Sequence, residues 1–146
     1  MVTKMIKSSE SNSKRITAYI VLWDKNKFLL VQEAIGSIRG SWGLPGGGVN
    51  KDETPEQAIS RETFEEVGYV VGSIEKIGVY TDPQRNSIRH LFRGEIKSGT
   101  LTLHPDELIS AKWCTHKEIN NLKLRGEWVN QAIGIPVSKN KRWGSI

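Results

Sequence analysis

The chain has 146 residues and a mass of 16.4 kDa, which is enough for one domain that buries roughly two-thirds of its unfolded surface without disulfides. Its 37% hydrophobic and 25% charged residues are typical of a globular protein, and no apolar run approaches the roughly 20 residues that a membrane span requires. The formal charge of +5 is concentrated near the chain ends, where we expect solvated tails, so nucleic-acid binding is a minor alternative.

The two ends of the chain differ in composition from its middle. Residues 1–13 are rich in serine and lysine and lack hydrophobic periodicity, which predicts a flexible basic tail. A second basic tail is predicted at 137–146, which leaves a single domain at 14–136. The N-terminus has no apolar stretch typical of a secretory signal, so we expect a cytoplasmic protein. The single cysteine, Cys114, lies in an apolar segment and is predicted to be a buried core residue.

The first ordered segment is predicted to be a β-hairpin. Hydrophobic residues dominate 15–24 and 27–34, and a turn-forming Asp-Lys-Asn triplet joins the two runs. We expect both strands to be largely buried. A loop rich in glycine and serine follows, and Trp42 in this loop is predicted to anchor it on the core.

A helix is predicted at about 55–67, and both of its ends are marked in the sequence. Thr54 and Gln57 form a capping box, Pro55 suits the first helical position, and Gly68 can end the last turn in a left-handed conformation. Because successive side chains are rotated by about 100°, one arc, which we expect to be exposed, carries Glu62, Glu65 and Glu66. A different arc is predicted to face the core and carries Ile59, Thr63, Phe64 and Val67.

The remainder of the chain predicts strands followed by short helices. The expected strands lie at 70–80, 87–97 and 108–114, with a short edge strand at 100–103. Two helices are expected, one at about 116–122, where Thr115 and Glu118 form a second capping box, and one at about 126–134. The sequence contains no internal repeat. This order of elements predicts an α/β fold.

The acidic face of the first predicted helix is the first indication of function. Glu62 and Glu66 are four residues apart and repel each other by roughly a few tenths of a kcal/mol on an isolated helix. Glu65 adds a third charge, and Arg61 is the one basic residue beside them. This face either points into water or holds a cation. Because its ligands are all hard oxygens, Mg²⁺ or Mn²⁺ is favoured over Zn²⁺.

A glycine-rich loop precedes this helix. In Pro45-Gly46-Gly47-Gly48 the backbone N–H and C=O groups can approach a ligand without interference from side chains, and a helix N-terminus follows within a few residues. The loop and the acidic helix together indicate a site where metal ions neutralise a diphosphate and activate a water for attack on phosphorus.

The spacing of residues in this stretch resembles a known signature. Gly47, five residues, Glu53, seven residues and then Arg61-Glu62-Thr63-Phe64-Glu65-Glu66-Val67-Gly68-Tyr69 is similar to the complete motif of the Nudix hydrolases. The departures are Thr63 and Tyr69, where the family tends to have aliphatic residues. The resemblance implies a Nudix-type α/β/α sandwich with a mixed β-sheet, and a metal-dependent hydrolase that acts on diphosphate bonds.

The resemblance also implies roles for individual residues. Glu62, Glu65 and Glu66 are expected to bind Mg²⁺ or Mn²⁺ or to hold its waters, with the carbonyl of Gly46 or Gly47 as a further ligand. The structural pair Glu53 and Arg61 is expected to brace the loop against the helix.

A further acidic residue from a later loop often acts as base or metal ligand in this family. Glu107 is our first candidate for this catalytic role, followed by Asp106 and Glu95. A solvated loop acid is an equally good interpretation of Glu107.

The substrate is expected to be a nucleotide-type small molecule. Arg85, Arg89 and His90 are cationic or can become so, and they are the candidate substrate-binding residues. Pro83 is placed like a proline of ADP-ribose pyrophosphatases, which favours ADP-ribose or a nucleotide sugar, although Asp82-Pro83 is explained equally well as a turn. Two alternatives remain open: a (deoxy)nucleoside triphosphate pyrophosphohydrolase that removes oxidised nucleotides, and a non-catalytic nucleotide-sensing or nucleic-acid-binding module. A homodimer is also open.

Overall fold

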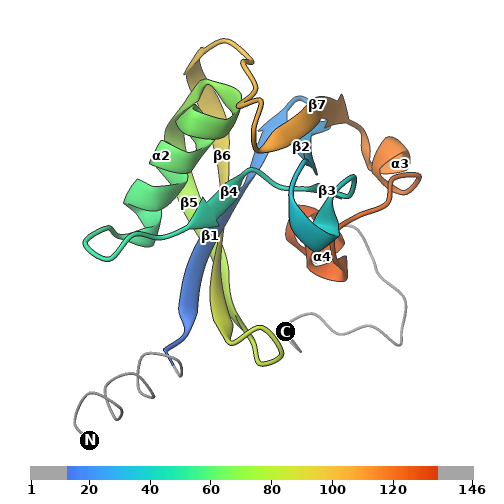
Figure 1. The fold of residues 1–146 in the computed structure, drawn as a ribbon. Helices are drawn as coiled ribbons and strands as arrows, with labels where there is room; N and C mark the ends of the chain where they lie inside the picture. Colours follow the sequence, from blue (N-terminus) through green and yellow to red (C-terminus); the bar gives the residue numbers. More distant parts are fainter. Residues whose placement is uncertain (1–12, 135–146) are drawn as a thin grey trace, which may run out of the picture.

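The computed structural model describes residues 13–134, and the basic tails predicted at 1–13 and 137–146 fall almost entirely outside this range. The strands are β1 (Arg15–Asp24), β2 (Lys27–Glu33), β3 (Trp42–Gly43), β4 (Gly46–Gly48), β5 (Tyr69–Asp82), β6 (Ser87–Gly99) and β7 (Leu108–Cys114). The helices are the 3₁₀ turn η1 (Gly36–Ile38) and the α-helices α2 (Pro55–Val67), α3 (His116–Ile119) and α4 (Glu127–Ile133). The predicted hairpin and the predicted order of the long strands and helices are confirmed (Figure 1).

A mixed β-sheet forms the centre of the fold. The strands lie in the order β3-β2-β1-β6-β5, with β4 also paired to β1 and β7 to β2. The pairing of β1 with β6 is parallel, from Arg15 opposite Ser87 to Leu22 opposite Gly94, whereas the other pairs in the described chain are antiparallel. Helix α2 covers one face of the sheet, and α4 covers the other (Figure 1). The predicted α/β/α sandwich with a mixed sheet is therefore confirmed.

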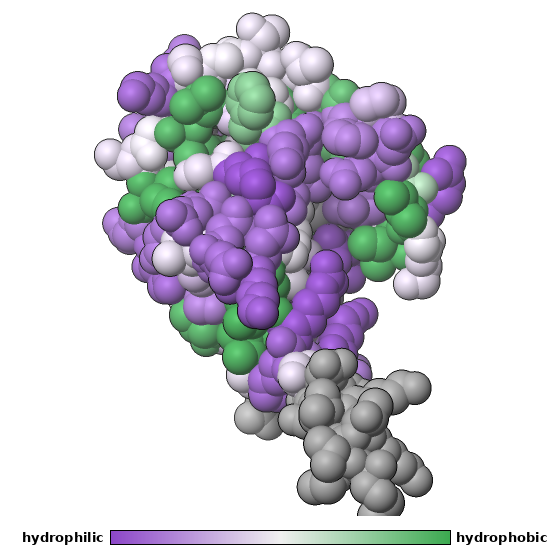
Figure 2. All heavy atoms as spheres, turned by 60° about the vertical axis from the view of Figure 1, so that its left-hand side comes forward, coloured by the Kyte–Doolittle hydropathy of each residue, from purple (hydrophilic) through white to green (hydrophobic). Residues whose placement is uncertain are grey.

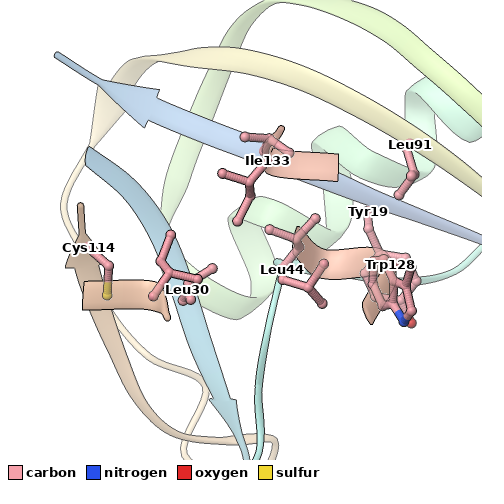
Figure 3. Close-up of a cluster of buried hydrophobic side chains, with 10 residues drawn as sticks. Tyr19, Leu30, Leu44, Leu91, Cys114, Trp128 and Ile133 are labelled. Carbon is pink, nitrogen blue, oxygen red and sulfur yellow. The ribbon is translucent and has the colours of Figure 1, made fainter. Parts of the chain in front are cut away.

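Strand β1 is central because both of its faces are buried. Its residues 17–22 are all buried, and side chains alternate between the two faces of a strand. Ala18, Ile20 and Leu22 pack in the cluster beneath α2. Tyr19 and Val21 pack with residues of α4 on the opposite face. Figure 3 shows Tyr19 beside Trp128 in this second cluster. Removing this apolar surface from water holds both helices against the sheet.

Helix α2 begins and ends where the sequence predicts. The Thr54 hydroxyl accepts a hydrogen bond from the Gln57 backbone N–H (3.1 Å), and the Gln57 side chain accepts one from the Thr54 N–H (2.9 Å). At the other end Gly68 has φ 79° and ψ 5°, and its N–H donates to the Phe64 carbonyl at 3.0 Å. Both devices satisfy backbone groups that a helix end otherwise leaves unpaired.

Two residues of α2 differ in exposure from what the sequence predicts. Glu66 is only 7% exposed, whereas Phe64, which was expected in the core, is 57% exposed. The reason is angular: seven residues separate Ile59 from Glu66, so a rotation of about 700° brings Glu66 within about 20° of the buried Ile59. Phe64 is about 140° from Ile59 on the same count and points to solvent. Glu62, Glu65 and Glu66 therefore do not share one exposed face.

Three smaller expectations also need correction. No strand forms at 100–103; instead the N–H of Thr102 donates to the carbonyl of the last residue of α2 at 2.9 Å, so this segment ties down the end of that helix. Helix α3 ends at Ile119 because the next residues form turns. Trp42 belongs to the short strand β3 rather than to a loop, although it packs on the core as predicted.

The described surface is largely hydrophilic. On the face that Figure 2 turns forward, hydrophilic residues predominate and hydrophobic ones occur in separate small groups. None of the helices within residues 13–134 is both long enough and apolar enough to cross a bilayer. Cys114 is fully buried in the cluster of Figure 3, as predicted.

Replacing Gly68 with alanine should destabilise the fold more than the same change at Gly36. Both glycines have left-handed φ angles, 79° and 72°, where alanine costs roughly 1–2 kcal/mol. A Cβ on Gly68 would also lie 2.5 Å from the Thr100 carbonyl oxygen, whereas one on Gly36 meets nothing within 4 Å. In urea unfolding followed by circular dichroism, the loss for Gly68→Ala should exceed that for Gly36→Ala by at least about 1 kcal/mol. Equal losses would contradict this expectation.

Candidate active site

The glycine-rich loop packs so closely against the sheet and α2 that side chains on its glycines would not fit. Strand β4 pairs antiparallel with β1, and a Cβ on Gly46 would lie 2.1 Å from the Ala18 carbonyl oxygen. Gly46 also has a φ of 149°, a conformation that other residues rarely adopt. A Cβ on Gly47 would lie 3.0 Å from the Glu62 carboxylate. The backbone of the loop therefore lies directly against the carboxylates of α2.

Glu66 joins this loop to α2. Its Oε1 accepts a buried hydrogen bond from the Gly46 backbone N–H at 2.9 Å. Burial raises the pKa of Glu66 to about 9, although this hydrogen bond opposes the shift, and the nearby Glu62 carboxylate adds to it. Burial also raises the pKa of Glu62, which Arg61 counteracts. For both carboxylates the cost of burial therefore outweighs the contacts that favour the charged form.

Arg61 connects the loop to three glutamates. Its Nε and Nη2 donate to the two oxygens of Glu53 at 2.7 and 2.9 Å, and Nη2 also donates to the Gly48 carbonyl at 3.1 Å. Its Nη1 donates to Glu62 at 3.1 Å and to Glu65 at 2.9 Å. Hydrogen bonds from Arg61 lower the pKa of Glu53 to about 2. These contacts are compatible with the predicted role of Glu53 and Arg61, which is to brace the loop against the helix. That role stays a prediction.

A cavity of about 380 Å³ opens beside this loop. Glu62, Glu66 and Glu107 form its acidic part, and the backbone of Gly46–Gly48 borders them. The other lining residues come from distant parts of the chain: Arg15, Tyr19, Glu33, Ile35, Ile38 and Arg125. Charged side chains dominate its lining, which suits a small charged ligand.

The donor chemistry of this cavity fits a hard divalent cation. Its acidic groups are all carboxylates, which suit Mg²⁺ or Mn²⁺, and a dication would offset the burial that raises the pKa of Glu66. Within residues 13–134, however, no three acidic, histidine or cysteine side chains converge as a set of metal ligands. Arg61 engages Glu62 and Glu65, and Gly46 engages Glu66. The donor chemistry carries more weight, because a cation of higher charge can replace these hydrogen bonds.

The structure separates the three candidates for an additional acid. Glu107, immediately before β7, lines the cavity, and its charge contributes to the raised pKa of Glu62 and Glu66. Asp106 is exposed and is not among the residues that line the cavity. Glu95 lies in a different hollow of the surface, which the tryptophans of β1 and β7 also line. Position therefore favours Glu107.

The predicted substrate-binding residues Arg85, Arg89 and His90 do not form one cluster at the cavity. Arg85 is exposed, and its Nη1 lies 3.0 Å from Oδ2 of Asp82. Arg89 is buried with its guanidinium carbon 4.1 Å from the centre of the Trp128 ring, and its Nε and Nη1 have no hydrogen-bond partner in the described part of the chain. Because neighbouring residues of β6 alternate, His90 points to the other face of the sheet, into a hollow at the start of α2. Their roles stay predictions.

Sequence reasoning missed the wall of the cavity opposite α2. Glu33 Oε2 and Arg125 Nη1 are 3.4 Å apart, and the guanidinium carbon of Arg125 lies 5.3 Å from the centre of the Tyr19 ring. Glu33 did carry a signal, because it is a lone charge after an apolar strand. Tyr19 and Arg125 carried none, because their proximity depends on how the segment after α3 returns to β3.

Comparison with known proteins places this geometry in a family. The model of the NUDIX domain matches residues 13–133, which include every residue that lines the cavity. The chain belongs to the Nudix family. It is a hydrolase that acts on diphosphate bonds, as the signature predicts. Among solved structures, a Nudix hydrolase from Nitrosomonas europaea has a TM-score of 0.72 and 26% sequence identity, covering 86% of this chain and 76% of that one.

Curated relatives of this Nudix protein carry different substrate names. A Bacillus subtilis (strain 168) protein provisionally named an 8-oxo-dGTP diphosphatase is 38% identical over 126 residues, which cover 78% of this chain and 83% of that protein. An ADP-ribose pyrophosphatase of Methanocaldococcus jannaschii is 35% identical over 51% of this chain and 49% of its own length. A Caenorhabditis elegans protein provisionally named nudix hydrolase 1 is 36% identical over 79% of this chain, and the match spans 33% of its length. The family is therefore established, and the substrate is not.

The melting temperature of Glu53→Gln should fall less in acid than that of the wild-type Nudix protein. The pKa of Glu53 is about 2 in the folded chain and about 4.3 in an unfolded one. Its pairing with Arg61 therefore stabilises the fold above a pH of about 4.3, and this contribution is lost as the pH falls through about 2. Over that interval the melting temperature of the wild type should fall more steeply than that of Glu53→Gln.

The matched control for this measurement is Glu56→Gln. Glu56 is exposed on the same helix and pairs with Lys76 at 3.6 Å, so its removal should leave the steep acid limb unchanged. If the melting temperatures of the wild type and of Glu53→Gln fell equally with pH, the contact with Arg61 would not lower the pKa of Glu53 as described.

Proposed function

We propose that this Nudix protein is an Mg²⁺- or Mn²⁺-dependent pyrophosphohydrolase of nucleoside triphosphates. The observation that carries the proposal is the composition of the cavity, with Glu62, Glu66 and Glu107 on the α2 side and Tyr19 with Arg125 on the α4 side. A ligand that has phosphates at one end and a flat base at the other matches this division. The carboxylates serve the phosphates through a cation, and the part of the lining formed by Arg125, Ile35 and Ile38 serves the base.

The carboxylates of α2 are the proposed metal-binding residues. Glu62 and Glu66 line the cavity, and Glu65 shares Arg61 with Glu62. The carbonyl of Gly46 is a proposed further ligand. When bound, the metal neutralises the diphosphate and lowers the pKa of a bound water.

The remaining groups of the site position the reactants and move the proton. Arg61 and Glu53 hold the loop against α2, which keeps the backbone of β4 beside the phosphates. Glu107 reaches the cavity from the segment before β7, and as an ionised carboxylate it can accept the proton of the attacking water. Arg15, which also lines the cavity, is proposed to contact a phosphate.

Two observations favour a nucleoside triphosphate over ADP-ribose. The residues that favoured ADP-ribose in the sequence are explained by a turn, because Asp82 Oδ1 accepts from the N–H groups of Gln84 and Arg85 at 3.1 and 3.2 Å, and its Oδ2 pairs with the Arg85 side chain. In addition, the B. subtilis relative named for a nucleoside triphosphate matches 78% of this chain, against 51% for the relative named for ADP-ribose.

ADP-ribose or a nucleotide sugar is the second candidate substrate. Arg89 supports it, because this buried guanidinium lies on the same face of the sheet as Tyr19 and has two nitrogens without a partner among the described residues. Such donors suit the acceptor groups of a ligand that extends past the cavity. Neither His90 nor Arg85 lines the cavity, so both have less support as phosphate ligands.

A product screen separates the candidates. The protein is incubated with Mg²⁺ or Mn²⁺ and nucleoside triphosphates, 8-oxo-dGTP, ADP-ribose or nucleotide sugars, and the products are identified by mass spectrometry. The proposal predicts a nucleoside monophosphate and pyrophosphate. Turnover of ADP-ribose to AMP without turnover of triphosphates would establish the second candidate instead. Binding without any turnover would favour the non-catalytic nucleotide-sensing module.

Glu66→Gln should lower kcat by at least about 100-fold, because a neutral amide is a poor ligand for a hard dication. The amide oxygen can still accept the Gly46 N–H, so the fold should persist, and circular dichroism would verify this. Glu56→Gln, on the exposed side of the same helix, is the matched control and should keep the wild-type kcat. A wild-type kcat for Glu66→Gln in steady-state kinetics would refute the metal-binding role.

A further inference from the structure

The wall of the cavity opposite α2 contains an arginine that is held in place. The backbone N–H of Arg125 donates to the Trp42 carbonyl at 2.8 Å, and its side chain packs on Gly43, where a Cβ would lie 2.5 Å from Arg125 Cδ. Its guanidinium carbon lies 5.3 Å from the centre of the Tyr19 ring and 5.6 Å from that of Trp128. These contacts hold a planar cation beside two aromatic rings, an arrangement that suits a guanidinium better than an ammonium group.

Glu33 completes this wall. Its Oε2 lies 3.4 Å from Arg125 Nη1, and the two side chains are 16% and 20% exposed. This separation is at the long limit for a hydrogen bond. The other oxygen of Glu33 and the other nitrogens of Arg125 have no hydrogen bond among the described residues. Because a carboxylate only accepts and a guanidinium only donates, the wall presents acceptors and donors side by side to the cavity.

The residues next to this pair are apolar. Ile35 is 59% exposed although it is a large aliphatic residue, and it lines the cavity together with Ile38. A flat heterocycle bound here would remove apolar area from water while its polar edge meets Glu33 and Arg125. The part of the cavity next to α2 offers no such surface, since its lining consists of carboxylates and glycine backbone. The Glu33 carboxylate adjoins this part, and its charge contributes to the raised pKa of Glu66.

We infer that Glu33 and Arg125, with the apolar side chains of Ile35 and Ile38 beside them, form the base subsite of this cavity, and that Glu33 with Arg125 selects guanine over adenine. The inference deepens the proposed function and rests on it. Guanine carries a ring N–H and an amino group, which a carboxylate can accept, next to a carbonyl that arginine recognises. Adenine has an amino donor where guanine has this carbonyl. Its N–H groups would therefore face the N–H groups of Arg125 with no acceptor between them, which is unfavourable.

The test compares GTP with ATP in the wild type and in Glu33→Gln. Glutamine keeps the size of the side chain and one acceptor oxygen but places an amide donor beside the guanine donors. The ratio of kcat/KM for GTP to that for ATP should fall by about tenfold or more, mainly through KM, because base contacts exist before the chemical step. Arg125→Lys, which keeps the charge but loses the planar donors, should lower the ratio in the same direction.

Exposed residues of the β5–β6 ribbon supply the controls. Glu75→Gln and Arg93→Lys lie outside the cavity and should keep the wild-type ratio. A wild type without preference for GTP, or an unchanged ratio in Glu33→Gln, would overturn the inference. If Arg125→Lys fails to fold by circular dichroism, Glu33→Gln still decides the outcome.

Binding separates this inference from the proposed function. If the wild type hydrolyses no triphosphate, the proposed function fails, and titration calorimetry with GMP and AMP then tests the base subsite alone. Tighter binding of GMP that Glu33→Gln weakens by about tenfold would support it. Equal affinities for GMP and AMP, or a preference that Glu33→Gln leaves intact, would overturn it.

Discussion

One buried hydrogen bond, from the Gly46 N–H to the Glu66 carboxylate, joins the two parts of the site. Burying a carboxylate without a full counter-charge is unfavourable, which the pKa of about 9 reflects. Gly46 belongs to a strand paired with the central β1, and Glu66 belongs to α2. The bond therefore fixes the position of the helix relative to the sheet, and the site is part of the packing of the domain rather than an addition to its surface.

Arg61 sets the electrostatic balance around this bond. It makes hydrogen bonds to Glu53, Glu62 and Glu65 but none to Glu66 in the described chain, so the innermost carboxylate keeps its excess of negative potential. Burial raises the pKa of Glu33 as well, with Glu107 adding to the shift and Arg125 opposing it. The apolar packing between β1 and α2 offsets the cost of gathering these groups. An acidic cavity of this kind suits a hard divalent cation.

The groups that we propose for chemistry and for recognition come from different parts of the fold. Glu62 and Glu66 lie on one helix and are held by the loop before it, whereas the other part of the lining is assembled from β1, the end of β2 and the segment before α4. Loops that carry Ile35 and Arg125 can change without disturbing the bond between Gly46 and Glu66. This separation explains how relatives with one signature carry names for different nucleotide substrates.

The sequence by itself determined the features that depend on near neighbours: the hairpin, the two ends of α2, and the spacing that lets Arg61 reach Glu53. Hydrogen bonds within a capping box or across one loop follow from residue type and spacing. The burial of Glu66 was also readable, because its angle to Ile59 follows from helix geometry, but the like charges suggested an exposed face instead. The opposite faces of Arg89 and His90 were readable too, because neighbouring residues of the predicted strand alternate. Only the tertiary structure brought Arg125 to Tyr19 and Glu33. Those placements depend on which strands pair and how the chain returns to them, and no local periodicity records such long-range contacts.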